Sequence, residues 1–249
     1  MNTRRFGLAC GVLALAVFLA PGAWAWADST GTPGQERNAA MEEILDQAQW
    51  LGHDGFLFRA GGKVVVFDPF RVKTSEPADL ILISHGHHDH CSPEDVAKFV
   101  GKDTVVVATA DCTAKLAGLG ADVRPIAPGE SLTVGGIAVK AIPAYNTDKA
   151  FHPRANGWVG FVADLGGVSV YHAGDTDLIP EMDGLAPDIA LLPVSGTYVM
   201  TWEQAVEAAR RIQPKVAVPM HYGGIVGTGK DAENFEKALR GEVRVRVYK

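Results

Sequence analysis

The chain has 249 residues, of which 47% are hydrophobic and 21% charged, and its formal net charge is −6. The apolar content is too high for an intrinsically disordered protein, and the 3 cysteines are too few for a disulfide scaffold. The acidic balance gives no electrostatic reason to expect a nucleic acid or an anionic membrane as a partner. Composition thus predicts an acidic, soluble protein whose length is compatible with a single domain.

The N-terminal segment has the three parts of a secretory signal peptide. Arg4 and Arg5 precede an apolar stretch over residues 8–20, and small residues follow up to Ala27. We predict a signal peptide over residues 1–27, and hence a periplasmic or secreted protein with no stable membrane span after cleavage. An uncleaved anchor is the alternative, although the apolar stretch is short for spanning a bilayer.

The rest of the chain divides into a short leader and one domain. Residues 28–40 are polar and rich in Gly, Ser and Thr, which predicts a flexible leader before a domain over residues 41–249. Hydrophobic periodicity predicts helices at 41–48, 93–100, 201–212 and 231–239. Apolar runs predict strands at 56–58, 63–67, 80–84, 104–108, 137–142, 160–163, 168–172, 189–194, 216–220 and 243–248. Strands that first form hairpins and then alternate with helices indicate a layered α/β sandwich.

Two cysteines, Cys91 and Cys112, would remain after cleavage. An oxidising compartment would permit them to pair, but their spacing does not show whether they approach to bridging distance. A disulfide and two buried free thiols therefore both stay open.

The chemically informative segment is residues 85–90, which read His-Gly-His-His-Asp-His and directly follow a buried-strand run. Neutral imidazoles and carboxylates are the ligands that hold zinc and similar divalent metals. A loop that leaves a strand end can turn His85 and His87 toward one metal. Asp89 and His90 can then reach a second metal, because paired ions lie only about 3.5–4 Å apart.

Two further residues with ligating side chains, Asp175 and His221, also follow predicted strands. A strand-end residue of either type is more often structural than a ligand when it stands alone. Both recur where a sandwich would place its active-site edge, so we expect them to complete the metal site.

The pattern resembles the metallo-β-lactamase-fold metallohydrolases. Within that superfamily the chain is most similar to the branch of ascorbate-phosphate lactonase-like and N-acyl-phosphatidylethanolamine phospholipase D-like proteins. The resemblance covers about residues 48–225, and it implies a four-layer αββα sandwich. The stretches that carry it, in the family's order, are residues 50–53, 67–70, 84–90, 143–144, 157–161, 173–176 and His221.

The resemblance implies a role for each candidate ligand. His85 and His87 would hold the first metal, and Asp175 would bridge the two metals. The second metal would be held by three residues, Asp89, His90 and His221. Zinc is the expected ion, one or two per chain. Manganese or iron is the alternative if the first site binds zinc less well than usual.

This chain departs from the family at one ligand. The family has a His just after the Pro-Ala pair, whereas this chain has Asn146. An amide is a far poorer zinc ligand than an imidazole. Three outcomes stay open: Asn146 ligates weakly, His152 from the following loop takes the place, or the first site is only partly occupied.

Four more residues are candidates for a place around the metals. His53 and Asp68 resemble family positions that orient ligand imidazoles through hydrogen bonds, although Asp68 equally suits a turn cap before a proline. Ser195 and Tyr198 stand on a loop expected near the pocket mouth, which makes them candidates for contact with substrate.

These observations predict a metal-dependent hydrolase of a small molecule. A metal-bound hydroxide would attack the carbonyl carbon of an ester or lactone, or the phosphorus of a phosphodiester. Asp89 and Asp175 would be the catalytic carboxylates, with Asp175 positioning the nucleophile. The alternative is a non-catalytic metal-binding protein that kept the fold and lost turnover when Asn146 replaced the family's His.

Overall fold

The computed structural model describes Met1 and residues 34–249. The predicted signal peptide and residues 28–33 of the predicted leader therefore lie outside the described residues, apart from Met1. Residues 34–249 belong to one compact unit. In the part of the chain that is described, no helix has both the length and the apolar character needed to cross a bilayer.

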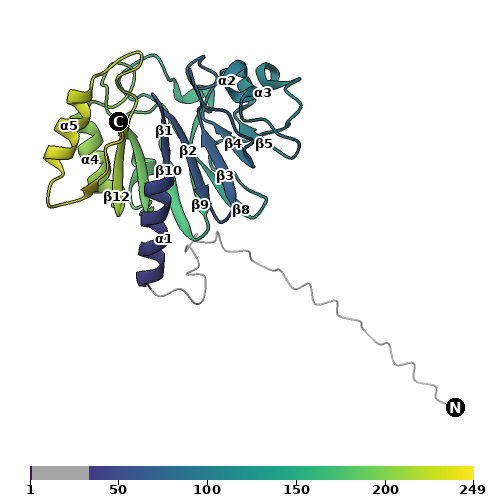
Figure 1. Ribbon diagram of the computed structural model, residues 1–249, viewed down its shortest axis with the longest axis horizontal. Coiled ribbons are helices and arrows are strands. Elements are labelled where there is room, and N and C mark those ends of the chain that lie inside the picture. The colour runs from purple at the N-terminus through teal and green to yellow at the C-terminus, as the bar shows by residue number, and fades with distance from the viewer. Residues whose placement is uncertain (2–33) are drawn as a thin grey trace. The chain divides into compact units, whose positions relative to one another are not determined.

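Two β-sheets form the centre of this unit (Figure 1). The first sheet has six strands in chain order: β1 (Gln49–Gly52), β2 (Gly55–Ala60), β3 (Lys63–Phe67), β4 (Leu80–Ile83), β5 (Val105–Ala108) and β6 (Asp122–Pro125). The second has seven, also in chain order: β7 (Ser131–Val134), β8 (Ile137–Pro143), β9 (Val159–Leu165), β10 (Val168–His172), β11 (Ile189–Pro193), β12 (Val216–Met220) and β13 (Arg244–Val245).

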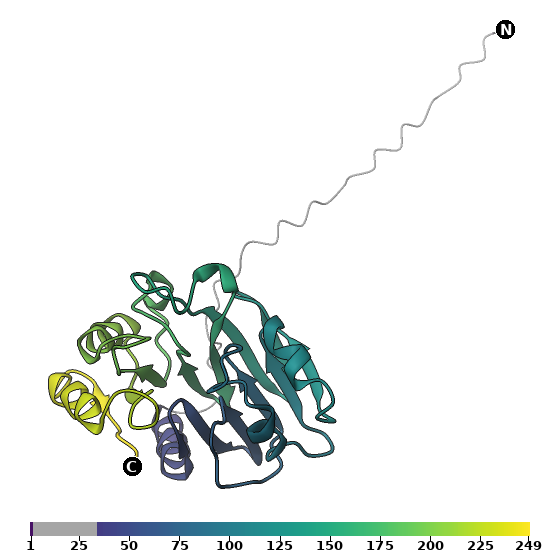
Figure 2. The ribbon, with the colours of Figure 1, turned by 90° about the horizontal axis from the view of Figure 1, so that it is seen from above.

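Helices cover the outer faces of the two sheets, as the view from above shows (Figure 2). The first sheet carries α2 (Pro93–Ala97) and α3 (Ala110–Leu116), and the second carries α4 (Trp202–Ile212) and α5 (Gly229–Ala238). A fifth helix, α1 (Gly34–Gln47), contacts both β2 and β10 and so bridges the two sheets. This arrangement confirms the predicted αββα sandwich of the α/β class.

Each sheet begins with antiparallel hairpins and continues with parallel strands. Pairing is antiparallel from β1 to β3 and from β7 to β10, and it is parallel from β3 to β6 and from β10 to β13. Parallel strands are covered on both faces and therefore read as continuous apolar runs. Every residue of β4, β11 and β12 is buried, in agreement with that rule.

Helix α1 corrects the predicted leader. Residues 34–40, expected to be flexible, are helical, and the predicted domain boundary at residue 41 falls inside α1. The helix is held by tertiary contacts: Met41, Ile44 and Leu45 are buried, and Arg37 donates to the buried carboxylate of Asp188 at 2.8 Å. A weakly amphipathic, polar sequence gives little local signal for such a helix, because packing supplies most of its stability.

Both cysteines of the unit are buried in the core between the first sheet and its helices, and both are free thiols. Cys91 follows the histidine segment and Cys112 lies in α3. Of the two outcomes that the sequence left open, the structure therefore has two buried thiols.

Candidate metal centre

The predicted ligands come together because each follows the carboxyl end of a strand. Asp68 follows β3, the histidine segment follows β4, Asp175 follows β10, and His221 follows β12. In open α/β sheets, ligands bind beyond the carboxyl ends of parallel strands. The strand directions thus bring distant segments of the chain to one edge of the sandwich.

One group of ligating atoms comprises His85, His87, His152 and Asp175, whose donor atoms all lie within 4.8 Å of one another. Nε2 of His85 is 3.0 Å from Nδ1 of His87, and Nε2 of His152 is 3.1 Å from Oδ2 of Asp175. These are the predicted ligands of the first metal, with His152 as the third imidazole.

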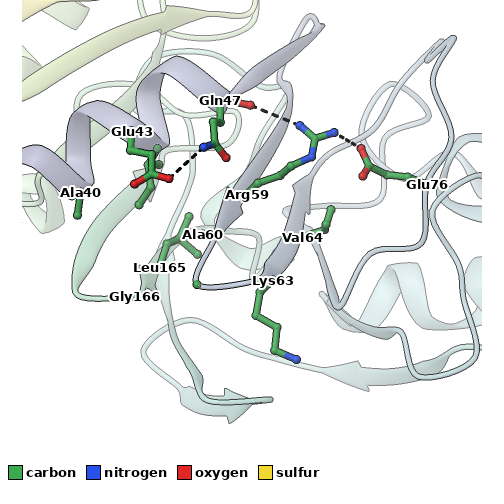
Figure 3. Close-up of a pocket in the computed structure, with 13 residues that line it drawn as sticks. Ala40, Glu43, Gln47, Arg59, Ala60, Lys63, Val64, Glu76, Leu165 and Gly166 are labelled. Atoms are coloured by element: carbon green, nitrogen blue, oxygen red, sulfur yellow. Dashed lines mark hydrogen bonds and ion pairs between the residues drawn. The ribbon is translucent and has the colours of Figure 1, made fainter.

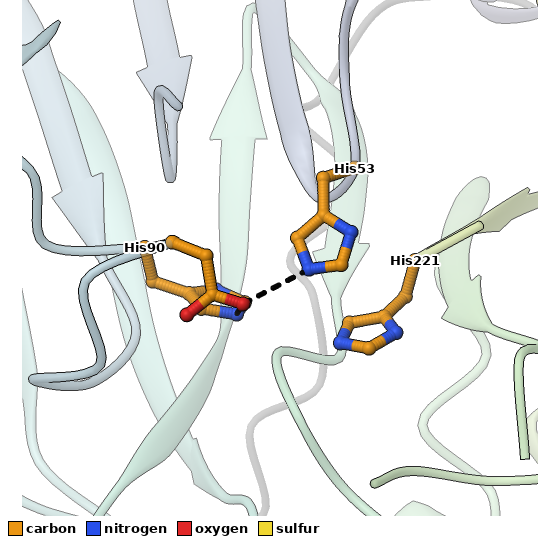
Figure 4. A group of neighbouring side chains, drawn as sticks. His53, His90 and His221 are labelled. Carbon is orange, nitrogen blue, oxygen red and sulfur yellow. Dashed lines mark hydrogen bonds and ion pairs between the residues drawn. The ribbon is translucent and has the colours of Figure 1, made fainter. Parts of the chain in front are cut away.

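The second group is centred on His90, His221 and Asp175. Nε2 of His90 is 3.4 Å from Oδ1 of Asp175, and Nε2 of His221 is 3.3 Å from Oδ2 of the same carboxylate. Asp175 therefore faces both groups, as a bridging ligand must. The rings of His90 and His221 point into one space together with the ring of His53 (Figure 4).

Asp89, predicted to ligate the second metal, lies beside His53. Since a carboxylate only accepts hydrogen bonds, Nε2 of His53 donates to Oδ2 of Asp89 at 3.1 Å. Burial alone raises the pKa of Asp89, but the hydrogen bond from His53 and the charge of His90 lower this pKa below its ordinary value. Asp89 is thus an ionised carboxylate, 3.9 Å from Nε2 of His90.

Four ligating atoms of this cluster are buried without hydrogen-bond partners, as expected for atoms that bind a metal. Among the residues that the structure describes, Nε2 of His90, His152 and His221 and Oδ1 of Asp175 receive and donate no hydrogen bond. A buried polar atom without a partner costs about 1–3 kcal/mol. Divalent cations coordinated by these atoms would remove that cost, so the residues present fit a metal centre.

The Nδ1 atoms of His85 and His90 do have hydrogen-bond partners, and these partners fix the orientation of the two rings. Oδ2 of Asp68 accepts from Nδ1 of His90 at 2.8 Å, and the hydroxyl of Ser84, 2.5 Å from Asp68, lies 2.9 Å from Nδ1 of His85. Metal-binding imidazoles are typically held in this way through their second nitrogen. Asp68 therefore orients ligands, and it also accepts from the backbone of Ser84.

Electrostatics set the protonation states of the imidazoles. Burial lowers the pKa of His85 well below its ordinary value. Burial also disfavours the charge of His90, but the carboxylates of Asp175 and Asp68 outweigh it and raise the pKa of His90 well above its ordinary value. The neutral form of the His85 imidazole is therefore favoured, whereas His90 lies where positive charge is favoured.

Asn146 and His152, the two candidates for the sixth ligand, lie side by side at the first group of ligating atoms. Oδ1 of Asn146 accepts from the backbone N–H of His152 at 2.9 Å and lies 3.1 Å from Nδ1 of its ring. Nδ2 of Asn146 donates to the carbonyl of Tyr198 at 2.9 Å. The amide of Asn146 thus faces His152 and Tyr198, and the imidazole of His152 reaches Asp175.

The two predicted substrate contacts have defined neighbours. The hydroxyl of Ser195 lies 2.8 Å from Nδ1 of His221, so Ser195 orients that imidazole. The ring of Tyr198 packs edge-on against exposed Phe151, with centroids 4.7 Å apart. Contact of either residue with a substrate stays a prediction.

Three residues of the centre have left-handed backbone conformations: His53 (φ 52°), Asp68 (φ 37°) and His221 (φ 60°). Such a conformation costs about 1–3 kcal/mol for a residue other than glycine and is frequent at functional sites. In each case the strand ends and the chain turns sharply, which directs the side chain into the cluster. The fold therefore stabilises these conformations through other contacts.

Sequence reasoning missed two residues of the centre. Trp158 packs on His85 and His87, with ring centroids 4.8 Å and 4.7 Å apart, and its Nε1 donates to Asp111 at 2.9 Å. Asp54 is fully buried, and its Oδ2 lies 3.6 Å from Nε2 of His90. Asp54 directly follows His53, and a charged residue inside an otherwise apolar strand start was the available signal.

A cavity of about 490 Å³ lies at the other end of the first sheet, between α1 and the β2–β3 turn (Figure 3). Arg59 in this cavity is hydrogen-bonded to Glu76 and to the carbonyl of Gln47, and Gln47 donates to Glu43. None of the candidate metal ligands lines this cavity. It is therefore separate from the metal centre.

Comparison with known proteins places the chain in a family. Residues 47–221 match the model of the β-lactamase superfamily domain. A UPF0173 metal-dependent hydrolase of Thermoplasma acidophilum is 40% identical over 212 residues, which is 80% of this chain and 92% of that protein. Its counterpart in Methanoculleus marisnigri is 37% identical, over 80% of this chain and 90% of that protein.

Solved structures agree with the sequence comparison. The crystal structure of a protein described as a metal-dependent hydrolase of Parabacteroides distasonis matches this chain with a TM-score of 0.72 and 32% sequence identity. The match covers 80% of this chain and 91% of that chain. The metallo hydrolase Igni18 of Ignicoccus hospitalis has a TM-score of 0.66 and 27% identity, with 81% and 94% covered. The chain therefore belongs to the metallo-β-lactamase superfamily, as its β-lactamase superfamily domain and the imidazole and carboxylate cluster indicate, and it is a metal-dependent hydrolase.

Proposed function

We propose that the chain hydrolyses a carboxylic ester or lactone of a small molecule at a centre of two divalent cations. The observation that carries this proposal is the set of buried, unpartnered ligating atoms around Asp175. His85, His87 and His152 would hold one cation, and His90, His221 and Asp89 the other, with Asp175 between them. The bound cations would supply an activated water and polarise the substrate oxygen.

The protein's own groups prepare the centre for that chemistry. Asp175 is held ionised, because the charges of His221 and His90 lower its pKa well below the ordinary value although burial alone raises it. Asp68 and Ser195 fix the rings of His90 and His221 through their Nδ1 atoms. These contacts keep the ligands in place before substrate arrives, so that little reorganisation is needed.

The loop that carries His152 favours an ester or lactone over a phosphodiester. Its two cationic side chains are engaged: Lys149 pairs with Asp177, and Arg154 pairs with Glu181. In both pairs the cation faces a carboxylate, which disfavours a second anion such as phosphate beside it. The exposed aromatic ring of Phe151 on the same loop suits an uncharged, apolar part of a substrate.

The alternative of a metal-binding protein without turnover depended on the absence of the family's His at position 146. His152 supplies an imidazole to the same group of ligating atoms, so Asn146 no longer argues for loss of activity. We further propose zinc as the ion of the imidazole-rich first group, and export of the protein by the predicted signal peptide.

The test is to measure metal content and turnover together on the protein without residues 1–27. Wild type should bind two ions per chain and hydrolyse members of a panel of lactones and aryl esters faster than phosphodiesters. His90→Ala should lose metal and turnover. His88→Ala is the matched control from the same loop, since the side chain of His88 is 78% exposed. Wild type with two bound ions and no hydrolysis of any ester, lactone or phosphodiester would contradict the proposal.

A further inference from the structure

Asp54 is a buried carboxylate that the ligand set above does not use. Its exposed fraction is 0%, and among the described residues neither Oδ1 nor Oδ2 has a hydrogen-bond donor. Buried carboxyl oxygens without a hydrogen-bond donor are unfavourable. Nε2 of His90 lies 3.6 Å from Oδ2 of Asp54, beyond hydrogen-bond distance, so both oxygens are free to bind a cation.

The backbone around Asp54 is held rigidly in the turn between β1 and β2. Nε2 of His172 donates to the carbonyl of Asp54 at 2.9 Å, and the backbone N–H of His221 donates to the carbonyl of His53 at 3.1 Å. A Cβ on the next residue, Gly55, would lie 3.2 Å from the carbonyl of Asp68. Contacts from both sheets thus fix where the Asp54 carboxylate points.

That carboxylate faces the second group of ligating atoms. One of its oxygens lies within 4.8 Å of the donor atoms of His90, Asp175 and His221, and all four residues are buried. Those three side chains contribute the unpartnered atoms described above. Two buried carboxylates that face each other repel, and a divalent cation between them converts that repulsion into attraction.

We infer that Asp54 is a further carboxylate of the cation position formed by His90 and His221, and that it adapts this position to a hard, six-coordinate ion of the Mn²⁺ or Fe²⁺ type. The inference rests on the proposed metal centre. His90 and His221 with the carboxylates of Asp54 and Asp175 form a mixed nitrogen and oxygen set, to which Asp89 would add a third carboxylate. Catalytic zinc typically takes three protein ligands and a water, whereas a pair of imidazoles with several carboxylate oxygens is typical of Mn²⁺ and non-haem Fe²⁺.

The experiment compares Asp54→Asn and Asp54→Ser with wild type, each prepared metal-free and then loaded with Mn²⁺ or Zn²⁺. The readouts are ions bound per chain, affinity by chelator competition, and the melting temperature of the metal-free protein. Loss of a metal-orienting or ligating group costs about 10–100-fold in affinity. We expect a loss of that size for one ion per chain, larger for Mn²⁺ than for Zn²⁺.

The melting temperatures of the metal-free proteins show whether Asp54 stabilises the fold without a cation. Replacing a buried carboxyl group whose oxygens have no hydrogen-bond partner should leave the melting temperature of the metal-free variants equal to or above that of wild type. Asp188→Asn is the matched control: Asp188 is equally buried but paired with Arg37 and Lys215, away from the centre. This control should lower the melting temperature with and without metal and leave metal affinity unchanged.

Three other results would each contradict one of these proposals. If wild type binds two ions and the Asp54 variants bind them equally well, this inference is overturned while the metal centre stands. An equal loss for Mn²⁺ and Zn²⁺ would overturn the assignment to a hard ion. Wild type that binds no ion would overturn the proposed function itself.

Discussion

Oδ1 of Asn146 accepts the backbone N–H of His152 and also meets Nδ1 of its ring, at 2.9 Å and 3.1 Å. The orientation of the amide is fixed, because Nδ2 of Asn146 donates to the carbonyl of Tyr198. An amide oxygen only accepts, so Nδ1 of His152 donates to it, and Nε2 is the nitrogen that faces Asp175. Asn146 therefore orients the imidazole of His152, which we propose as the ligand in place of the His expected at position 146.

Substitutions at these two positions should separate ligand from positioning residue. His152→Ala should lose one ion per chain and most of the turnover. Asn146→Ala should still bind two ions at saturating metal, but with about 10–100-fold lower affinity, because the imidazole loses its orienting partner. Metal content at limiting and saturating concentrations, together with kcat and KM, measures the difference.

The control for that pair is Asn156→Ala, which removes an exposed amide from the same loop. It should change neither metal affinity nor turnover. If Asn146→Ala lost one ion and His152→Ala kept two, Asn146 would be the ligand and the positioning role would be refuted.

Removal of metal should destabilise the protein, because ligand atoms that are buried and unpartnered would then face one another. A ligand at 100 times its Kd stabilises the folded state by about 2.7 kcal/mol per site. We therefore expect a chelator to lower the melting temperature by several degrees and readdition of metal to restore it, as followed by circular dichroism. A melting temperature that is independent of metal would argue against the centre.

The ion pairs of Asp188 should make the docking of α1 dependent on pH. Burial alone raises the pKa of Asp188, but the hydrogen bonds from Arg37 and Lys215 lower it below its ordinary value. A carboxyl with a lowered pKa in the folded state stabilises the fold above its unfolded pKa of about 3.9, and this contribution disappears as pH falls. The melting temperature of Asp188→Asn should thus lie below that of wild type at pH 7 and approach it below about pH 4.

Asp183→Asn is the control for this pH series, since the side chain of Asp183 is 59% exposed and 3.9 Å from Arg211. Exposed pairs contribute about 0–1 kcal/mol, so its melting temperature should follow that of wild type at every pH. A constant difference between wild type and Asp188→Asn from pH 7 to pH 3 would show that charge is not the cause.

Gly160 should tolerate no side chain. A Cβ there would lie 2.5 Å from the carbonyl oxygen of His172 and 2.6 Å from that of Ala173, which belong to the backbone leading to Asp175. Backbone atoms of a paired strand cannot move aside cheaply, and overpacking of this kind costs about 1–3 kcal/mol. Chemical denaturation of Gly160→Ala should show that loss.

The matched glycine is Gly229 at the start of α5, where a Cβ would meet nothing within 4 Å. Gly229→Ala should be neutral or slightly stabilising, because alanine reduces the freedom of the unfolded chain. Equal stability of the two variants would refute the steric argument for Gly160.

Much of the fold was predictable because its strands are apolar runs with clear ends. The strands at 63–67, 168–172 and 216–220 have the predicted bounds. The short elements β1, β6, β7 and α3 were not predicted, since four to seven residues give too little periodicity for an assignment. The predicted strand at 243–248 is reduced to Arg244–Val245, because β13 is the edge of its sheet and pairs only with β12.

The sequence by itself determined the predicted chemistry of the centre: the type and spacing of residues 85–90 indicate metal ligation, and the strand before them places them at a strand end. Strand-end positions also predicted Asp175 and His221. Only the tertiary structure placed the imidazole of His152 and the carboxylate of Asp54 at the same cluster, because both residues lie more than 30 positions from that segment and no local pattern brings them there. The packing of the two sheets buries their polar atoms without hydrogen-bond partners, next to the other candidate ligands.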